Sequence, residues 1–542
     1  MKKLSYIALL LLFSSLASFA NNVQLTNLSI VNYGPGAIQI KFDVSWDNSW
    51  RTNVGPANYD GVWVFFKYKQ PGGDWTHLNL TGTNNIVPFN FDVFQNNLGV
   101  TKPGALIYRE NTNLGVGTVT ATNVSLGVIS NLPYDIDVKG FAIEMVYVPP
   151  PGVNTRAVFG DGNGTTESVN ALHVADNVAT DNAVLPVLCD ANAFDDAELD
   201  ADGIYVYSND TIQLTNPFGT LEAFPTMKAL WCMKYEISQA SYRDFLNTLD
   251  SLQQVTRTAA SPTSFTGTSA LSNIGRNFIE IMSPAALNTP AVYGCDANSN
   301  NIYNEAADGE WLACNYLAWP DIAAFLDWSG LAPMTEVQYE RMCRGNSSAG
   351  GNAAVLGEYA WGTNTIFGSS YTLTGNATAA EVASNASPSL GNAAYSATSG
   401  SGPLRSGVFA TATSNRITSG ASYYGIMDMS GNMTEYCISL GSVAGRSCRY
   451  VLNGNGVISN LGNAQFTPGS AGFWPGMEGN GNLNAINTCN GTCEVTGAAG
   501  IRYRGGSIGE TAASLSISDR GQVFTPTARA FNRGGRGVLY IR

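Results

Sequence analysis

The sequence predicts a multidomain protein, in which an all-β domain is followed by a larger α+β domain. Residues 21–139 contain several short apolar–polar alternations separated by Gly and Pro turns, which is the pattern of half-buried strands. Helical spacing with helix-capping residues occurs only within residues 140–542. Beyond residue 345 the chain is rich in Gly, Ser and Asn, which favours long loops with short strands.

The first 20 residues have the three parts of a secretory signal peptide. A positively charged start (MKK) precedes an apolar stretch at 7–13 and a small-x-small cleavage site at 18–20. Asn21 follows that site, so we expect no lipid-carrying Cys there. Later stretches fall short of the ~18 consecutive apolar residues that a membrane span needs. The sequence therefore predicts a secreted, periplasmic or cell-surface protein without a membrane span.

The composition restricts the partners. The formal net charge is −13, and only 13% of the residues are charged. Because binding to a phosphate backbone needs a basic face, we do not expect nucleic acid as a partner.

The nine cysteines all follow the predicted cleavage site, where an exported chain can form disulfides. An odd number leaves at least one thiol unpaired. Cys489 with Cys493 and Cys437 with Cys448 are plausible pairs, but the pairing does not follow from the sequence.

Residues 21–139 are expected to form a β-sandwich. The segments 38–46 and 62–68 both alternate apolar and polar residues, so each strand should have one buried and one solvent-exposed face. Further short strands are expected near 105–108, 117–121, 124–129 and 134–138. Several short strands with Gly and Pro turns and no helical period favour an immunoglobulin-like sandwich.

Three helices are expected in the second domain. The first begins after Ser238 as N-cap and has apolar residues at helical spacing as far as 249. The second begins at Trp319-Pro320 and ends at Gly330. The third begins with a capping box at 335–338 and ends at Gly345.

Eight segments of the second domain resemble, in the same order, motifs of the formylglycine-generating enzyme family, also called sulfatase-modifying factors. The resemblance covers residues 140–542 and implies a C-type-lectin-like core of twisted sheet with two packed helices and long loops. The segments are MVYVPPPG (145–152), MKYEISQASYRDFLNTL (233–249), CNYLAWPDIAAFLDWSG (314–330), LAPMTEVQYERMCRG (331–345), EYAWG (358–362), GIMDMSGNMTEY (425–436), YRGGS (503–507) and GGRGVLYIR (534–542).

The chemistry of that family is not expected here. Its enzymes carry two cysteines on the strand after the Gly-Gly-Ser turn, which bind copper and activate oxygen to oxidise a target Cys. The resemblance places those positions at Glu510 and Leu515, and neither supplies the thiolate that Cu(I) prefers. The iron-dependent relatives need a cluster of His, and only His173 lies in this domain, since His77 belongs to the sandwich. Copper is therefore not expected, and the domain resembles a pseudoenzyme.

The resemblance also implies a calcium site at 428–435. The alternative is that this segment is a structural turn without an ion. Its ligands would be the side chains of Asp428 and Glu435 and the carbonyls of Gly431 and Met433, a set of hard oxygen donors that suits calcium. Two acidic stretches, 196–203 and 296–305, are either cation loops or solvated loops, and the sequence leaves this open.

Residues near the C-terminus carry the candidate ligand-binding groups. Residues 502–542 contain seven Arg against only Glu510 and Asp519. The arginines either fix loops or line a cleft for an anionic ligand. The candidates are Ser507, Glu510, Ser514, Ser516, Asp519, Arg520, Arg529 and Arg533.

Three functions are compatible with these patterns. The favoured one is a secreted, non-catalytic binding or recognition protein of bacterial type, which takes an extended peptide or glycan, anionic if the arginines line the cleft. The first alternative is a structural component of a cell-surface assembly of the gliding- or secretion-machine type, with self-association or complex partners. The second is an active sulfatase-modifying enzyme.

Overall fold

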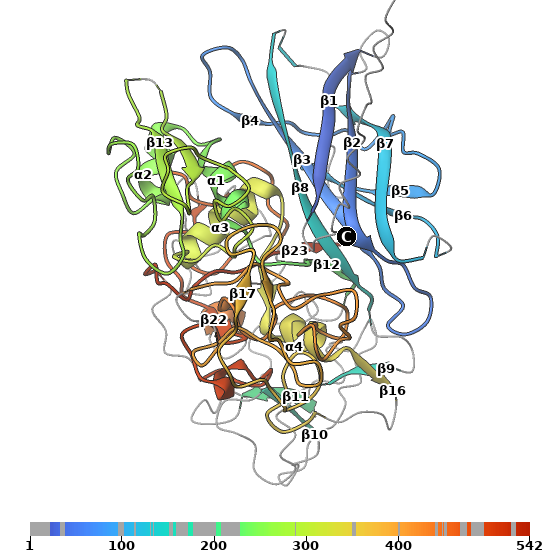
Figure 1. The fold of residues 1–542 in the computed structure, drawn as a ribbon. Helices are drawn as coiled ribbons and strands as arrows, with labels where there is room; N and C mark the ends of the chain where they lie inside the picture. The colour runs from blue at the N-terminus through green and yellow to red at the C-terminus, as the bar shows by residue number, and fades with distance from the viewer. Residues whose placement is uncertain are drawn as a thin grey trace, which may run out of the picture.

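A computed structural model of the chain shows two packed sheets that continue into a loop-rich region with four main helices (Figure 1). The structure describes residues 22–32, 38–95, 102–112, 115–129, 132–133, 135–150, 155–158, 172–176, 202–206, 228–287, 289–348, 354–398, 402–439, 443–446, 448, 452–466, 474–477, 493–521 and 527–541. The predicted signal peptide lies outside the described residues.

The N-terminal region consists of strands, as predicted. A three-stranded antiparallel sheet has the order β1-β2-β7, and a second sheet has the order β23-β12-β8-β3-β6-β5, with β4 paired to β3. The N-terminal strands are β1 (Gln24–Asn32), β2 (Ile38–Ser49), β3 (Asp60–Lys69), β4 (Thr76–His77), β5 (Phe91–Phe94), β6 (Ala105–Arg109), β7 (Gly117–Val128) and β8 (Asp137–Val148).

The two sheets pack through an apolar cluster. The alternation predicted for β2 is confirmed, because Phe42 and Val44 point inward while Lys41 and Asp43 do not. These side chains meet Val64 and other inward residues of β3. The two strands expected near 117–121 and 124–129 form one strand, β7, whose register shifts where it passes β2.

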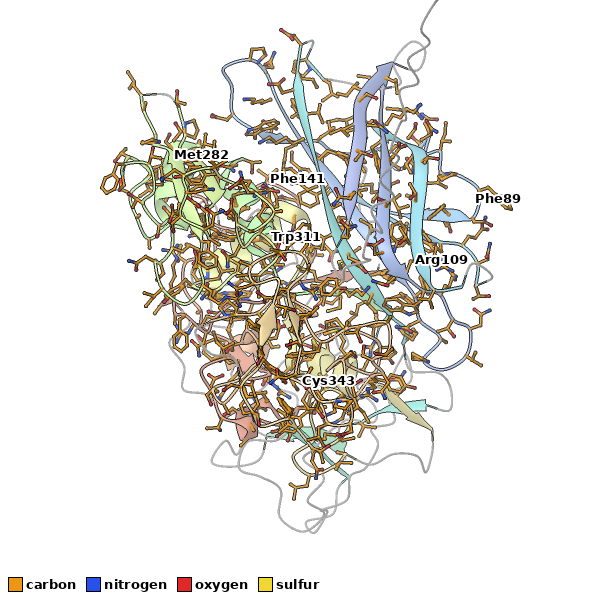
Figure 2. All side chains as sticks on the ribbon, in the orientation of Figure 1. Phe89, Arg109, Phe141, Met282, Trp311 and Cys343 are labelled. Atoms are coloured by element: carbon orange, nitrogen blue, oxygen red, sulfur yellow. The ribbon has the colours of Figure 1, made fainter. Side chains whose placement is uncertain are left out.

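The expectation of a solvent-exposed face on β3 is wrong. Its first eight residues are all buried. The Trp63 indole nitrogen donates to the Ser329 carbonyl at 2.8 Å, and the Phe65 ring lies 4.9 Å from the Trp328 ring. Phe141 of β8 reaches the same Trp328 ring at 4.8 Å, and Figure 2 shows it between the sheet and the helical part. The second face is therefore covered by the helix that contains Trp328.

The larger sheet crosses from the N-terminal region into the loop-rich region, as Figure 1 shows. β8 pairs with β3 on one side and with β12 (Leu230–Met233) on the other, and β12 pairs with β23 (Val538–Tyr540) near the C-terminus. The predicted division at 139/140 lies within β8. Strands from both ends of the chain thus share one set of backbone hydrogen bonds.

The three predicted helices are confirmed with their caps. α1 (Gln239–Leu246) begins at Ser238, α3 (Trp319–Ser329) ends at Gly330 with φ of 75°, and α4 (Glu336–Arg344) has the capping box at 335–338. A further helix, α2 (Ser251–Arg257), was not predicted, although Asp250 and Gln253 form a capping box of the same kind.

The remaining elements are short and hold the loops in place. β15, β19 and β22 form a three-stranded sheet, and the others form two-stranded pairs or single turns. They are β9 (Thr155–Ala157), β10 (Leu172–Asp176), β11 (Asp202–Val206), β13 (Ile279–Ser283), β14 (Val292–Cys295), β15 (Met334–Thr335), β16 (Asn346–Ser348), β17 (Leu373–Thr374), β18 (Val382–Ala383), β19 (Glu435–Ile438), α5 (Val443–Arg446), β20 (Gln465–Phe466), β21 (Cys493–Glu494), β22 (Ile501–Arg504) and the 3-10 helix η3 (Ala512–Leu515).

The structure addresses part of the cysteine pairing. Cys437 is a buried free thiol, so the suggested disulfide with Cys448 is not formed. Cys493 is disulfide-bonded, whereas Cys489 lies outside the described residues. Within the described part of the chain, no helix combines the length and apolar character that crossing a membrane requires.

Candidate functional site

The segment after β22 turns sharply at two glycines. Gly505 and Gly506 have φ of 83° and 61°, the left-handed region that favours glycine. A Cβ on Gly506 would lie 2.6 Å from a methyl carbon of Leu515, so the chain passes too close for a side chain. The expected strand after this turn is not formed. Instead the Ser507 carbonyl accepts from the Glu510 N–H at 3.1 Å, and the chain folds back on itself into η3.

Glu510 forms the centre of a small polar cluster, in which Ser507 is fully buried and Glu510 and Asn532 are half-buried. The Ser507 hydroxyl donates to Glu510 Oε2 at 2.5 Å, and the Asn532 side-chain amide donates to Glu510 Oε1 at 3.2 Å. The same amide lies 3.3 Å from Ser507 Oγ, so the three side chains fix one another. Asn532 was not among the sequence candidates, because only the fold brings the return loop to this turn.

The carboxyl group of Glu510 is held in a partly desolvated position. Burial raises its pKa above the ordinary value, and nearby Asp519 acts in the same direction, while the hydrogen bond from Ser507 and the charge of Arg533 oppose the shift. Phe531 is 44% exposed and lies over Gly509, where an added Cβ would come within 2.7 Å of its ring. The cluster therefore presents a carboxylate beside an exposed aromatic ring.

Leu515 has no exposed reactive group. It is fully buried and packs with Tyr359, Trp361 and Tyr395. A carboxylate and a buried alkyl group do not fit a two-thiolate copper site. The thiols of Cys232 and Cys343 are buried elsewhere in the core, and burial raises the pKa of each to about 12, which disfavours the thiolate.

Two of the three candidate arginines are bound within the protein. Arg520 donates from Nε and Nη2 to the two oxygens of Glu336, at 2.6 and 2.9 Å. Arg529 donates to both oxygens of Asp321, at 2.8 and 2.7 Å, and to two backbone carbonyls. Their N–H groups thus fix loops, as one of the two sequence interpretations proposed.

Arg533 and Arg529 are both half-buried, whereas Arg520 is fully buried. The Arg533 guanidinium donates to the Ala528 carbonyl at 2.5 Å and lies 5.3 Å from the centre of the Tyr503 ring. The other candidates bond locally: Asp519 accepts from the Gly521 N–H at 2.9 Å, and the Ser516 hydroxyl donates to the Ala513 carbonyl at 2.9 Å.

A network of buried charged side chains lies next to the turn at Gly505 and Gly506. Arg504 of β22 donates to Glu336 at 3.2 Å and also pairs with Glu340. Burial alone would raise the pKa of Glu336, but the charges of Arg520 and Arg504 outweigh it and lower the pKa to about 2. Glu336 is therefore ionised in the folded protein over the whole neutral range.

The candidate calcium loop at 428–435 is buried. The Asp428 carboxylate accepts from the Gly407 N–H at 2.6 Å, and Glu435 Oε1 accepts from Arg536 Nε at 2.5 Å. Glu236, which the sequence did not single out, lies beside the loop and accepts from the Asn432 side-chain amide at 2.5 Å. Burial and then the charge of Asp428 raise the pKa of Glu236 well above its usual range.

The residues at this loop are compatible with calcium. Glu435 Oε2 is buried and has no hydrogen-bond partner among the described residues, so a cation beside it would satisfy an otherwise isolated oxygen. In the described ranges no three His, Cys, Asp or Glu side chains converge as metal ligands. The expected set, however, uses only two such side chains, together with the carbonyls of Gly431 and Met433.

In the loop at 296–305, several side-chain oxygens accept hydrogen bonds from groups of the same loop. The Asp296 carboxylate accepts from the N–H groups of Asn300 and Asn301 at 3.1 and 2.8 Å. The Asn300 amide donates to Glu305 at 2.7 Å. Of the stretch 196–203, the structure describes only the end, within β11.

Residues 215–477 match the family model described as "Sulfatase-modifying factor enzyme 1-like domain". The match includes α1, α3, α4 and the loop at 428–435. It ends before β22 and the Glu510 cluster. A search of curated proteins finds no match.

Proposed function

Because this chain carries a sulfatase-modifying factor enzyme 1-like domain, we propose that it uses the domain as an exported binding module rather than as an oxidase. The observation that carries the proposal is the identity of the two positions after the Gly-Gly-Ser turn. Glu510 is held by Ser507 and Asn532, and Leu515 is buried in an apolar cluster. Both positions are built into other contacts and offer no thiolate.

The proposal includes the finer features expected from the sequence. The N-terminal sheets belong to an immunoglobulin-like sandwich, and the loop-rich region has a C-type-lectin-like core. The protein is secreted, periplasmic or located at the cell surface. Its ligand is an extended peptide or glycan that contacts the Ser507–Glu510–Asn532 cluster, and where the ligand carries an anionic group, that group binds at Arg533. Polar groups beside an exposed ring suit such a ligand better than a buried apolar one.

The first test concerns catalysis. We expect no formylglycine when the full chain is incubated with a Cys peptide of the sulfatase type, with and without added copper, because no pair of thiolates is available at the turn. Mass spectrometry of the peptide detects the aldehyde. Stoichiometric aldehyde would contradict the proposal.

The second test concerns binding. A peptide and glycan array identifies a probe, which is then titrated against wild type, Glu510→Ala and Thr511→Ala. Thr511 is the matched control, because it is exposed and adjacent but lies outside the cluster. We expect about a tenfold loss of affinity for Glu510→Ala alone. Equal affinities would remove the cluster from the proposed site.

We also propose that Asp428 and Glu435, with the carbonyls of Gly431 and Met433, hold a structural calcium ion. A ligand that binds only the folded state stabilises it by about 2.7 kcal/mol at a hundredfold excess over its Kd. We therefore expect calcium to raise the Tm of wild type and Glu435→Gln to reduce that shift. Asp519→Asn is the control, because Asp519 lies outside the loop. An unchanged melting curve on chelation would contradict the calcium site.

A further inference from the structure

A cavity lies between the N-terminal sheets and the loop-rich region, away from the Glu510 cluster. Its volume is about 620 Å³, within the usual range for small-molecule sites. The end of β2 and the following loop, residues 48–58, form one wall, and the loop at 410–427 forms the other. Lys234 and Tyr235, which follow β12, lie between them. The residues that line the cavity include none from 507–536.

An aromatic side chain forms a flat wall of this cavity. Trp50 is half-buried, and its ring lies against Gly425, where an added Cβ would come within 3.3 Å. Its indole nitrogen lies 3.4 Å from Asn58 Oδ1, and the Asn58 amide donates to the Tyr424 carbonyl at 2.7 Å. Both parts of the molecule therefore hold Trp50 in one orientation before any ligand arrives.

The two charged residues that line the cavity are already engaged. Lys234 pairs with the buried Glu144, lies 4.0 Å from Asp60 and sits 4.9 Å from the centre of the Trp50 ring. Arg416 donates to the carbonyls of Cys343 and Ala360 at 3.0 and 2.8 Å. The cavity lining contains no carboxylate. Lys234 is therefore paired with carboxylates, whereas Arg416 keeps its charge, because it donates to carbonyls and its Nε has no hydrogen-bond partner among the described residues.

The rest of the rim mixes apolar side chains with short hydroxyl and amide side chains. Six of these polar side chains are Asn48, Thr52, Thr411, Ser414, Asn415 and Ser419. Several of them already bond within their own loop, as the Ser414 hydroxyl does to the Thr411 carbonyl at 3.0 Å. Hydroxyl and amide groups match the alternating donors and acceptors of sugar hydroxyls. A sugar ring also has an apolar C–H face, which an aromatic ring can cover. The combination of a fixed indole with short hydroxyl and amide side chains matches a carbohydrate.

We infer that this interdomain cavity is a binding site for a neutral glycan, in which one sugar ring stacks on Trp50 and its hydroxyls bond to the polar side chains of 48–58 and 411–419. The site uses both parts of the chain and does not depend on Glu510. It is thus a second recognition site, separate from the Glu510 cluster. It gives the junction between the N-terminal sheets and the loop-rich region a function in ligand binding.

The test uses the full chain and a panel of neutral oligosaccharides: maltoheptaose, cellohexaose, chitohexaose, laminarihexaose and xylohexaose, with unmodified peptides as a second panel. Isothermal titration measures the affinity of each. We expect at least one oligosaccharide to bind with Kd below about 1 mM, a weak but specific affinity. Trp50→Ala should reduce that affinity about tenfold or more, and Trp50→Phe should retain most of it.

Controls separate this site from a general loss of folding and from the Glu510 cluster. Trp75→Ala removes another half-buried tryptophan outside the cavity and should leave the affinity unchanged, as should Glu510→Ala. Ser419→Ala gives a second variant within the cavity, which loses a hydrogen bond of 3.3 Å from its hydroxyl to the Arg416 carbonyl. It should also weaken binding, so the test still holds if Trp50→Ala unfolds the chain. The inference is overturned if no oligosaccharide binds, if both cavity variants bind as wild type does, or if only peptides bind in a Trp50-dependent manner.

Discussion

The interior of the two facing sheets differs from the interior of the loop-rich region in the interactions that stabilise it. Between the sheets, the core is a cluster of apolar side chains that alternate along β2 and β3. In the loop-rich region, five arginines rank among the largest fully buried side chains, whereas the N-terminal sheets contain one, Arg109. The five are Arg341, Arg405, Arg504, Arg520 and Arg536.

The difference follows from the groups that form hydrogen bonds with the backbone in each region. Strands in a sheet satisfy each other's N–H and C=O groups, so their side chains need only fill space. Long loops leave carbonyls that need other donors, and a guanidinium offers five N–H groups in a fixed plane. Arg341, for example, donates to the carbonyls of Pro149 and Lys228, at 3.1 and 3.0 Å. Charged side chains thus provide in the loops what strand pairing provides in the sheets.

The largest expected effect comes from removing a buried arginine. Arg504→Met leaves Glu336 with one partner fewer and Glu340 with the charge of Arg344 alone near it. Breaking such a buried pair typically costs about 3–5 kcal/mol. Urea unfolding measures the change. Arg502→Met, on the same strand but half-exposed, should cost less than about 1 kcal/mol. Similar values for both variants would mean that burial of the charge network contributes little.

The pH dependence of the same network gives a second, somewhat smaller effect. The pKa of Glu336 is lowered to about 2 in the folded protein from its ordinary value of 4.5. A depressed carboxyl pKa contributes stability that is fully present above pH 4.5 and is lost as the pH falls towards 2. The contribution amounts to about 3 kcal/mol. We therefore expect the difference in unfolding free energy between wild type and Glu336→Gln to shrink between pH 6 and pH 3. A pH-independent difference would contradict this assignment.

The smallest effect belongs to the apolar core between the sheets. Ile40→Val removes one buried methylene group and should cost about 0.5–1.5 kcal/mol, with no pH dependence between pH 6 and pH 3. Lys41→Ala is the control, since its side chain points away from the cluster. A cost for Ile40→Val that exceeds that of Arg504→Met would reverse the comparison between the two regions.

Local signals in the sequence were sufficient to predict the three helices α1, α3 and α4 and the buried face of strand β2. Ser238, Gly330 and the capping box at 335–338 act within a few residues of themselves, so their structures could be predicted. The alternation along β2 similarly identified its buried face. The unpredicted α2 has the same kind of local signal, because Asp250 and Gln253 form a capping box at its start.

The tertiary structure decided which distant segments meet. The burial of both faces of β3 depends on Trp328 and Ser329, more than 250 residues away. Arg520 and Arg529 could be assigned to Glu336 and Asp321 only once the fold was known. The sequence shows that a side chain is charged or apolar, and short-range spacing shows the element it joins. Its partner is set by packing between segments, which the order of residues along the chain does not specify.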